Sequence, residues 1–131
     1  MKFKLSLMLL LTVAAAAAAF AQNQTSTFDG ATKSKIVTFD APGAGTGPYQ
    51  GTQAFDVNPA GAITGQYNDS SGVYHGFVRH PDGHITKFNV PGAGKESGQG
   101  TNNVYGSNPA GAITGYYSDS SNVYHGFLRT P

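Results

Sequence analysis

Two histidines occupy matching places in a sequence that is written twice. Residues 58–79 read NPAGAITGQYNDSSGVYHGFVR and residues 108–129 read NPAGAITGYYSDSSNVYHGFLR, with 18 of 22 positions identical. His75 and His125 each follow a tyrosine and stand two positions before a phenylalanine. Imidazoles in such a repeat could serve as general bases or as metal ligands.

The residues around these histidines favour a structural role. The sequence contains no cysteine, neither His75 nor His125 belongs to a His-x-His or His-x-x-x-His pair, and no carboxylate lies at a typical ligand interval. The other two histidines, His80 and His84, have no counterpart in the second copy. A polar residue that recurs in each repeat usually makes the same hydrogen bond in each, so we expect His75 and His125 to be structural.

Each copy also carries one aspartate in a serine-rich turn, Asp69 in NDSSG and Asp119 in SDSSN. These turns resemble part of a calcium loop, but they lack its alternating Asp/Asn ligands and its terminal glutamate. We therefore expect each aspartate to accept hydrogen bonds from its own turn backbone. The sequence predicts no catalytic residue, no metal site and no cofactor, and hence a protein that is not an enzyme.

Glycine-rich loops and serines are the remaining features that could suggest catalysis or phosphate binding. PGAGTGPYQGT at 42–52 and PGAGKESGQGT at 91–101 lack Gly-Lys-Ser/Thr and do not lead into a helix. No serine lies in a Gly-x-Ser-x-Gly motif. We interpret the two loops as connections between repeat units.

Tyrosines and arginines at identical places in the two copies are the candidates for ligand binding. Tyrosine rings stack on the C–H faces of sugars and arginine donates directional hydrogen bonds, and one weak site per repeat gains from multivalency. Alternating tyrosines are also ordinary sheet packing. The candidate binding residues are Tyr67, Tyr74, Arg79, Tyr117, Tyr124 and Arg129.

Short strands separated by tight turns are predicted throughout the repeat. The turns are Asn58–Gly61, Asp69–Gly72 and Pro81–Gly83. Gly72 is replaced by Asn122 in the second copy, which predicts a left-handed residue there because both types tolerate positive φ. Strands are predicted at 35–40, 52–57, 62–67, 73–79, 84–90, 102–107, 112–117 and 123–129. Alternation places Ile63, Gly65 and Tyr67 on one face, and likewise His75, Phe77 and Arg79.

The repeat extends to a third motif and has the length of a propeller blade. TFDAPGAG at 38–45 returns as KFNVPGAG at 87–94, an offset of 49 residues. The predicted fold is all-β, with two four-stranded antiparallel propeller-like blades from a repeat of about 50 residues. The last blade lacks a fourth strand, and 35–40 has no blade of its own, so we expect the N-terminal strand to close the last blade.

The order of these motifs resembles that of the HAF-type probable extracellular repeat, in which I-x-G-Y, H-[AG]-F-[LV] and T-x-F-D-x-P-G-A strands follow one another. Here they are GAITGYYSDSSNVYHGFLR and, in the first copy, HPDGHITKFNVPGAG, and the resemblance covers residues 35–131. It implies a secreted bacterial protein with propeller-like blades and no established activity. The signature positions that it implies are His75, Phe77, His125 and Phe127.

The first 21 residues have the pattern of a signal peptide. Lys2 and Lys4 precede an apolar stretch that ends in Ala19-Phe20-Ala21, and the stretch is shorter than a membrane span. We predict a signal peptide at 1–21, a linker at 22–34, a two-repeat domain at 35–131, and a secreted or periplasmic protein. Without Lys2 and Lys4, six basic residues face seven acidic ones and none cluster, which argues against binding to nucleic acid and to anionic membrane surfaces. We also expect no membrane insertion after cleavage.

Two blades do not close a ring, since propellers hold about four to eight. The sequence therefore predicts either a homo-oligomer, as a dimer or trimer, or a fragment of a longer repeat protein. The predicted function is an exported non-enzymatic repeat protein of structural or binding type. The alternative is a multivalent, lectin-like module that binds glycan or cell-envelope carbohydrate as an oligomeric propeller.

Overall fold

The computed structural model describes residues 35–131, and this part of the chain contains strands and no helix. The predicted all-β class is therefore confirmed. The strands are β1 (Gly51–Val57), β2 (Ile63–Asn68), β3 (Tyr74–Arg79), β4 (Ile85–Phe88), β5 (Gly100–Ser107), β6 (Ile113–Ser118) and β7 (Tyr124–Arg129). The predicted signal peptide and linker lie outside the described residues. Between residues 35 and 131, no helix of the length and hydrophobicity of a membrane span occurs.

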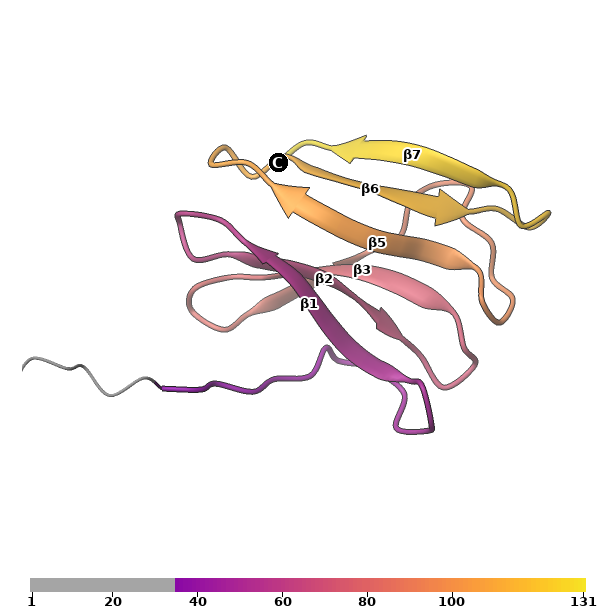
Figure 1. Cartoon of the computed structure of the whole chain (residues 1–131), viewed down its shortest axis with the longest axis horizontal. Coiled ribbons are helices and arrows are strands. Elements are labelled where there is room, and N and C mark those ends of the chain that lie inside the picture. Colours follow the sequence, from indigo (N-terminus) through magenta and orange to yellow (C-terminus); the bar gives the residue numbers. More distant parts are fainter. Residues whose placement is uncertain (1–34) are drawn as a thin grey trace, which may run out of the picture. The chain divides into compact units, whose positions relative to one another are not determined.

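The seven strands form one mixed sheet that is not closed, in the order β1-β2-β3-β5-β6-β7 with β4 paired to β3. Figure 1 shows two sets of antiparallel neighbours, which we call the first strand group (β1–β4) and the second strand group (β5–β7). A single parallel pair, Tyr74 with Gly100, joins them. The groups correspond to the two copies of the repeat.

Residues 35–40, predicted as an eighth strand, are not a strand in the structure. In the described part of the chain β7 pairs only with β6, so the second group has three strands, and the predicted closure within one chain is wrong. The physical reason lies just after this segment. The Ala41 N–H donates to Thr52 Oγ1 (2.8 Å) at the start of β1, which holds the chain against the first strand group. Ala41 is therefore bonded to β1, at the opposite end of the strand order from β7.

The turns form as their residue types predict. In the turn after β1, the Gly61 N–H donates to the Asn58 carbonyl (2.8 Å), and Asn58 Oδ1 accepts from the Ala62 N–H (3.0 Å). Gly72 has a φ of 81° and Asn122 has a φ of 61°, which confirms the predicted left-handed position. These turns fix the register of the flanking strands.

Two small apolar clusters form the core. One consists of Ala41, Tyr67 and Phe77, and the other consists of Val78, Val104 and Ile113. The second cluster takes residues from both strand groups, so it packs them together. The predicted faces are confirmed by the register of β2 with β3, in which Gly65 is opposite Phe77, Tyr67 opposite His75 and Ile63 opposite Arg79. Glycine at 65 leaves room for the Phe77 ring, because a methyl group there would lie 2.8 Å from it.

Candidate functional site

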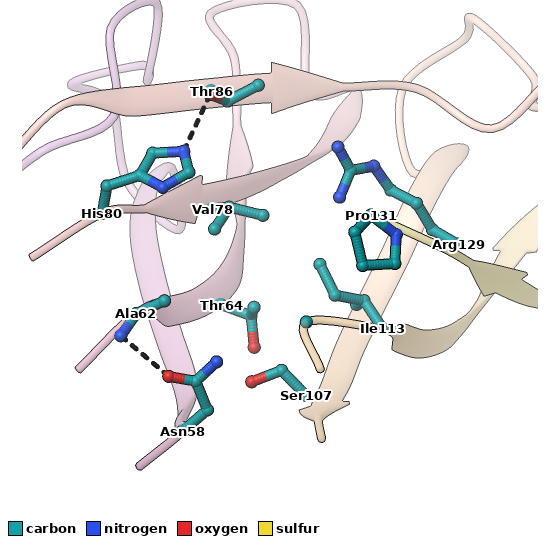
Figure 2. Close-up of a pocket in the computed structure, with 11 residues that line it drawn as sticks. Asn58, Ala62, Thr64, Val78, His80, Thr86, Ser107, Ile113, Arg129 and Pro131 are labelled. Atoms are coloured by element: carbon teal, nitrogen blue, oxygen red, sulfur yellow. Dashed lines mark hydrogen bonds between the residues drawn. The ribbon is translucent and has the colours of Figure 1, made fainter. Parts of the chain in front are cut away.

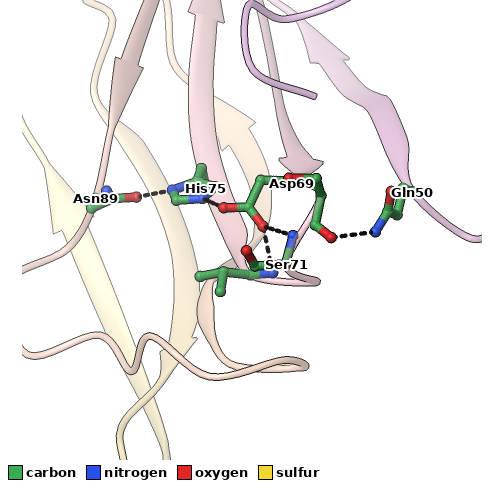
Figure 3. Close-up of polar contacts among 7 residues, drawn as sticks. Gln50, Asp69, Ser71, His75 and Asn89 are labelled. Carbon is green, nitrogen blue, oxygen red and sulfur yellow. Dashed lines mark hydrogen bonds and ion pairs between the residues drawn. The ribbon is translucent and has the colours of Figure 1, made fainter. Parts of the chain in front are cut away.

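The histidine of the first repeat links the turn after β2 to the segment after β4 (Figure 3). His75 Nε2 lies 2.9 Å from Asp69 Oδ2, and its Nδ1 lies 2.8 Å from Asn89 Oδ1. The imidazole also stacks on the Tyr67 ring, with centroids 4.8 Å apart. The Asp69 carboxylate can only accept, so Nε2 carries a proton, and the Asn89 amide can present either its oxygen or its nitrogen to Nδ1. A general base needs a nitrogen that can reach the substrate, and His75 has both engaged.

The aspartate of each repeat organises its own turn, as predicted. Asp69 Oδ1 accepts from the Ser71 N–H (2.8 Å) and the Val73 N–H (3.0 Å) while Oδ2 contacts His75. Burial alone would raise the pKa of the Asp69 carboxyl, but the hydrogen bonds from His75 and the two amides outweigh it and hold the pKa below its ordinary value. Within residues 35–131, no group of three or more His, Cys, Asp or Glu side chains is placed to hold a metal ion.

The second repeat reproduces this network except for one contact. His125 Nε2 lies 3.1 Å from Asp119 Oδ2, and the His125 ring stacks on Tyr117 with centroids 5.0 Å apart. Hydrogen bonds from the Val123 amide and from His125 lower the pKa of Asp119. His125 Nδ1 has no partner among the described residues. The repeat counterpart of Asn89 is Asp40, which is exposed at the start of the structure.

The candidate tyrosines are divided between the core and the surface. Tyr67 is only 5% exposed, and its ring lies between His75 and the backbone at Gly43. Tyr117 lies in the same way between His125 and Gly92, so the Pro-Gly-Ala-Gly loops cover these rings. Tyr74 is half-buried, whereas Tyr124 is 71% exposed. The face of Tyr67 is therefore occupied by protein.

Both candidate arginines lie over phenylalanine rings. The Arg79 guanidinium is 5.0 Å from the centroid of Phe39, and the Arg129 guanidinium is 5.0 Å from the centroid of Phe88. Arg79 lies on β3 and Phe39 lies before β1, whereas Arg129 lies on β7 and Phe88 lies on β4. These cation–π contacts are part of the packing between consecutive repeat units.

A pocket of about 320 Å³ lies between the two strand groups (Figure 2). Thr64, Asn58 and Ser107 line one side of it, and Arg129 lies with Pro131 on the other side. Thr64 is 1% exposed, and its hydroxyl has no hydrogen-bond partner in the described structure. Sequence reasoning identified only Arg129 among these residues. One feature of the sequence could have indicated this pocket: a threonine interrupts the otherwise apolar strand sequence AITG in both copies.

No family model matches the chain, and the comparisons with curated proteins and with solved structures also give no match.

Acid should weaken the fold through the two turn aspartates. The folded chain lowers the pKa of Asp69 and Asp119, so their stabilising effect is complete above the unfolded value of about 3.9 and is lost as pH falls through the folded value. We expect the free energy of unfolding, measured with urea, to decrease as the pH falls below about 4. The double variant Asp69→Asn and Asp119→Asn should lose much of this slope. An unchanged slope in that variant would contradict the assignment.

Proposed function

We propose that this chain is an exported, non-enzymatic β-repeat module of structural or binding type, built from propeller-like blades of the HAF type. The observation that carries the proposal is the placement of the repeat histidines. Each is bound to a turn aspartate and stacked on a tyrosine, and His75 also bonds Asn89. With both ring nitrogens engaged, His75 positions backbone segments and does not offer a nitrogen to a substrate.

The chemistry of the surroundings supports this reading. A nucleophilic mechanism needs a hydroxyl or thiol within hydrogen-bond reach of its base. The hydrogen-bond partners of His75 are a carboxylate and an amide, and the partner of His125 is a carboxylate. The histidine is best understood as the centre of a structural unit repeated in each blade.

Glutamine variants of the two histidines test the proposal. His75→Gln should reduce the free energy of unfolding by about 1–2 kcal/mol, because the Asp69 carboxylate loses a charge-assisted hydrogen bond in a partly buried site. The measurement is urea unfolding of each variant, with His84→Gln as a surface control. A hydrolytic or redox activity of the parent chain that disappears in folded His75→Gln/His125→Gln protein would overturn the proposal.

A second candidate function, binding of a carbohydrate, is favoured by the pocket between the strand groups. The unpartnered Thr64 hydroxyl and the Arg129 guanidinium both line it, and a buried hydroxyl without a partner is destabilising unless a ligand or water bonds to it. A sugar hydroxyl offers both a donor and an acceptor. This pocket replaces the exposed tyrosine face that the sequence suggested as the site.

The pocket can be tested with one isosteric substitution. Neutral mono- and disaccharides should shift the amide resonances of pocket residues such as Ser107 in the parent chain, and Thr64→Val should weaken this binding at least about tenfold, the effect of one lost hydrogen bond. Thr114→Val, at the exposed repeat counterpart of Thr64, is the matched control. Equal binding by both variants would exclude the pocket as the site.

A further inference from the structure

Within the chain, the first repeat unit contacts the start of the second, and we call this contact the junction. The same contact could form a second time, between the two ends of the described chain. In this junction β4 pairs with β3, with Gly76 opposite Phe88, and the chain then continues to Gly100, which pairs with Tyr74. The sequence of 85–101 is the repeat counterpart of 36–52, and the sequence of β3 is the counterpart of β7. The two ends of the described chain therefore carry the two halves of another junction.

The N-terminal half is already arranged for this junction. Phe39 packs edge-on against Phe77, with centroids 5.9 Å apart, as Phe88 packs against Phe127 at 6.1 Å. The bond from the Ala41 N–H to Thr52 Oγ1 (2.8 Å) has its counterpart in the bond from the Val90 N–H to Thr101 Oγ1 (2.9 Å). The backbone also agrees further along, because φ is +115° at Gly51 and +123° at Gly100. Residues 39–51 thus repeat the ring contact, the hydrogen bond and the backbone geometry of the complete junction.

The C-terminal half exposes the positions that the complete junction buries. Val73 is 9% exposed and Val78 is 8% exposed, whereas their counterparts Val123 and Leu128 are 51% and 66% exposed. Tyr124, next to Val123, is also exposed. Tyr124 and Leu128 on one face of β7, together with Val123 just before the strand, are therefore an apolar surface that no described residue covers.

Space for a specific side chain remains on this face. The Phe88 ring covers Gly76 so closely that a methyl group at Gly76 would lie 2.5 Å from it. At Gly126 the nearest atom to such a methyl group is the Gly115 carbonyl oxygen at 3.9 Å. A hollow of about 450 Å³ lies at this point, bounded by Gly126, His125, Tyr116 and Tyr124. By the repeat correspondence, the ring that fits against Gly126 is that of Phe39.

We propose that β7 of one chain binds residues 36–40 of a second copy as its fourth strand. This inference rests on the structural role proposed above for the repeat units, and it names a second copy of this chain as the partner. The internal junction sets the register, in which Phe39 of the second copy lies opposite Gly126, Thr38 opposite Phe127, Val37 opposite Leu128 and Ile36 opposite Arg129. The Tyr124 backbone would then meet Gly51, as Tyr74 meets Gly100.

The contact is head-to-tail, because one chain contributes its C-terminal strand and the other its N-terminal segment. Repetition of such an interface gives a closed ring when the rotation between units closes and a filament when it does not. Either form removes the open edge of β7 and covers Leu128. Pairing by a second copy thus supplies the fourth strand that residues 35–131 of one chain do not provide for β7.

The same register brings Asp40 of the second copy to the open nitrogen of His125. Asp119 and Tyr117 are the titratable groups that face His125 in its own chain, and Asp40 would be the third. Asp40 would stand there as Asn89 stands beside Nδ1 of His75. Asp40→Asn restores the amide found at Asn89, so this variant should preserve assembly. Loss of assembly in Asp40→Asn would contradict the proposed register.

Solution mass and one glycine substitution test the proposal. Light scattering of the exported chain should give a whole-number multiple of the chain mass, or filaments. Gly126→Val should give single chains, because the added side chain occupies the hollow while meeting open space in its own chain. A parent chain that is folded and single at all concentrations overturns the strand exchange, as does assembly of Gly126→Val equal to that of the parent. Neither result affects the histidine variants, which test the proposed function separately.

Cross-linking tests the register even if Gly126→Val does not fold. The sequence has no cysteine, so only introduced thiols react. Oxidation of Val37→Cys/Leu128→Cys should link chains to one another, because these two residues are opposite in the proposed register. Thr38→Cys/Leu128→Cys is the matched control, since a shift of one residue places the thiols on opposite faces. Equal linkage in both variants, or none in either, contradicts the proposed pairing.

Discussion

Gly100→Ala should reduce the free energy of unfolding by about 3 kcal/mol or more, the largest effect expected for a single added methyl group. Gly100 has a φ of +123°, a conformation that residues with a side chain rarely adopt. A methyl group there would also lie 2.1 Å from the Tyr74 carbonyl oxygen, so β3 and β5 would have to separate. This is the one parallel pair that joins the two strand groups. Urea unfolding of the variant and the parent measures the difference.

Gly51→Ala is the matched control for this prediction. Gly51 has nearly the same φ, +115°, but the nearest atom to an added methyl group is the Gly45 carbonyl oxygen at 3.9 Å. In single chains, kept apart by Gly126→Val, this change should cost only backbone strain, about 1–2 kcal/mol. Equal losses for the two alanine variants would show that strain, and not the contact with Tyr74, determines the cost.

The sequence predicts the strands and turns of this protein well because their signals are local. Asn58 and Gly61 are turn residues at fixed spacing, and alternation along 62–67 and 73–79 fixes which side chains share a face. The exchange of Gly72 for Asn122 correctly indicates positive φ from two residue types alone. Each of these inferences depends only on residues within about ten positions of one another, so no knowledge of tertiary contacts is needed.

Strand pairing of the N-terminal segment could not be predicted in the same way. Residues 35–40 have the pattern of β4, but a strand also needs a partner edge, and β4 has β3 beside it. The sequence pattern at 35–40 does not depend on whether the chain offers an unpaired strand edge for these residues to pair with. A local signal can identify a segment as suited to a strand without locating its partner.

The candidate binding residues were less predictable because stacking and burial are tertiary properties. Tyr67 is a residue type that stacks on sugars, yet His75 stacks on its ring, the Lys87 ammonium group lies over the ring, and Gly43 lies beside it. Arg79 is directed to Phe39, which lies forty residues earlier in the sequence. The pocket at Thr64 arises where the two strand groups meet, and neither repeat alone contains it.

Phe77→Ala should reduce the free energy of unfolding by about 3–5 kcal/mol, because it removes a fully buried ring from the core. Phe77 is 0% exposed, packs edge-on against Phe39 and lies over Gly65. The surrounding strands cannot collapse into the space, since their registers are fixed by the turns. Urea unfolding provides the measurement. If the alanine variant does not fold, Phe77→Leu should show a smaller loss in the same direction.

Comparing the stability cost of Phe127→Ala in single chains and in assembled chains tests whether assembly buries this ring. Phe127 occupies the same place in the repeat, but it is only half-buried in one chain because, between residues 35 and 131, β7 pairs with β6 alone. In the Gly126→Val background its removal should cost about half as much as removal of Phe77, in proportion to the apolar area buried. In the assembled parent the cost should approach that of Phe77→Ala and rise with protein concentration, since association stabilises only the folded chain. A cost that is the same in single and assembled chains would mean that assembly leaves this face uncovered.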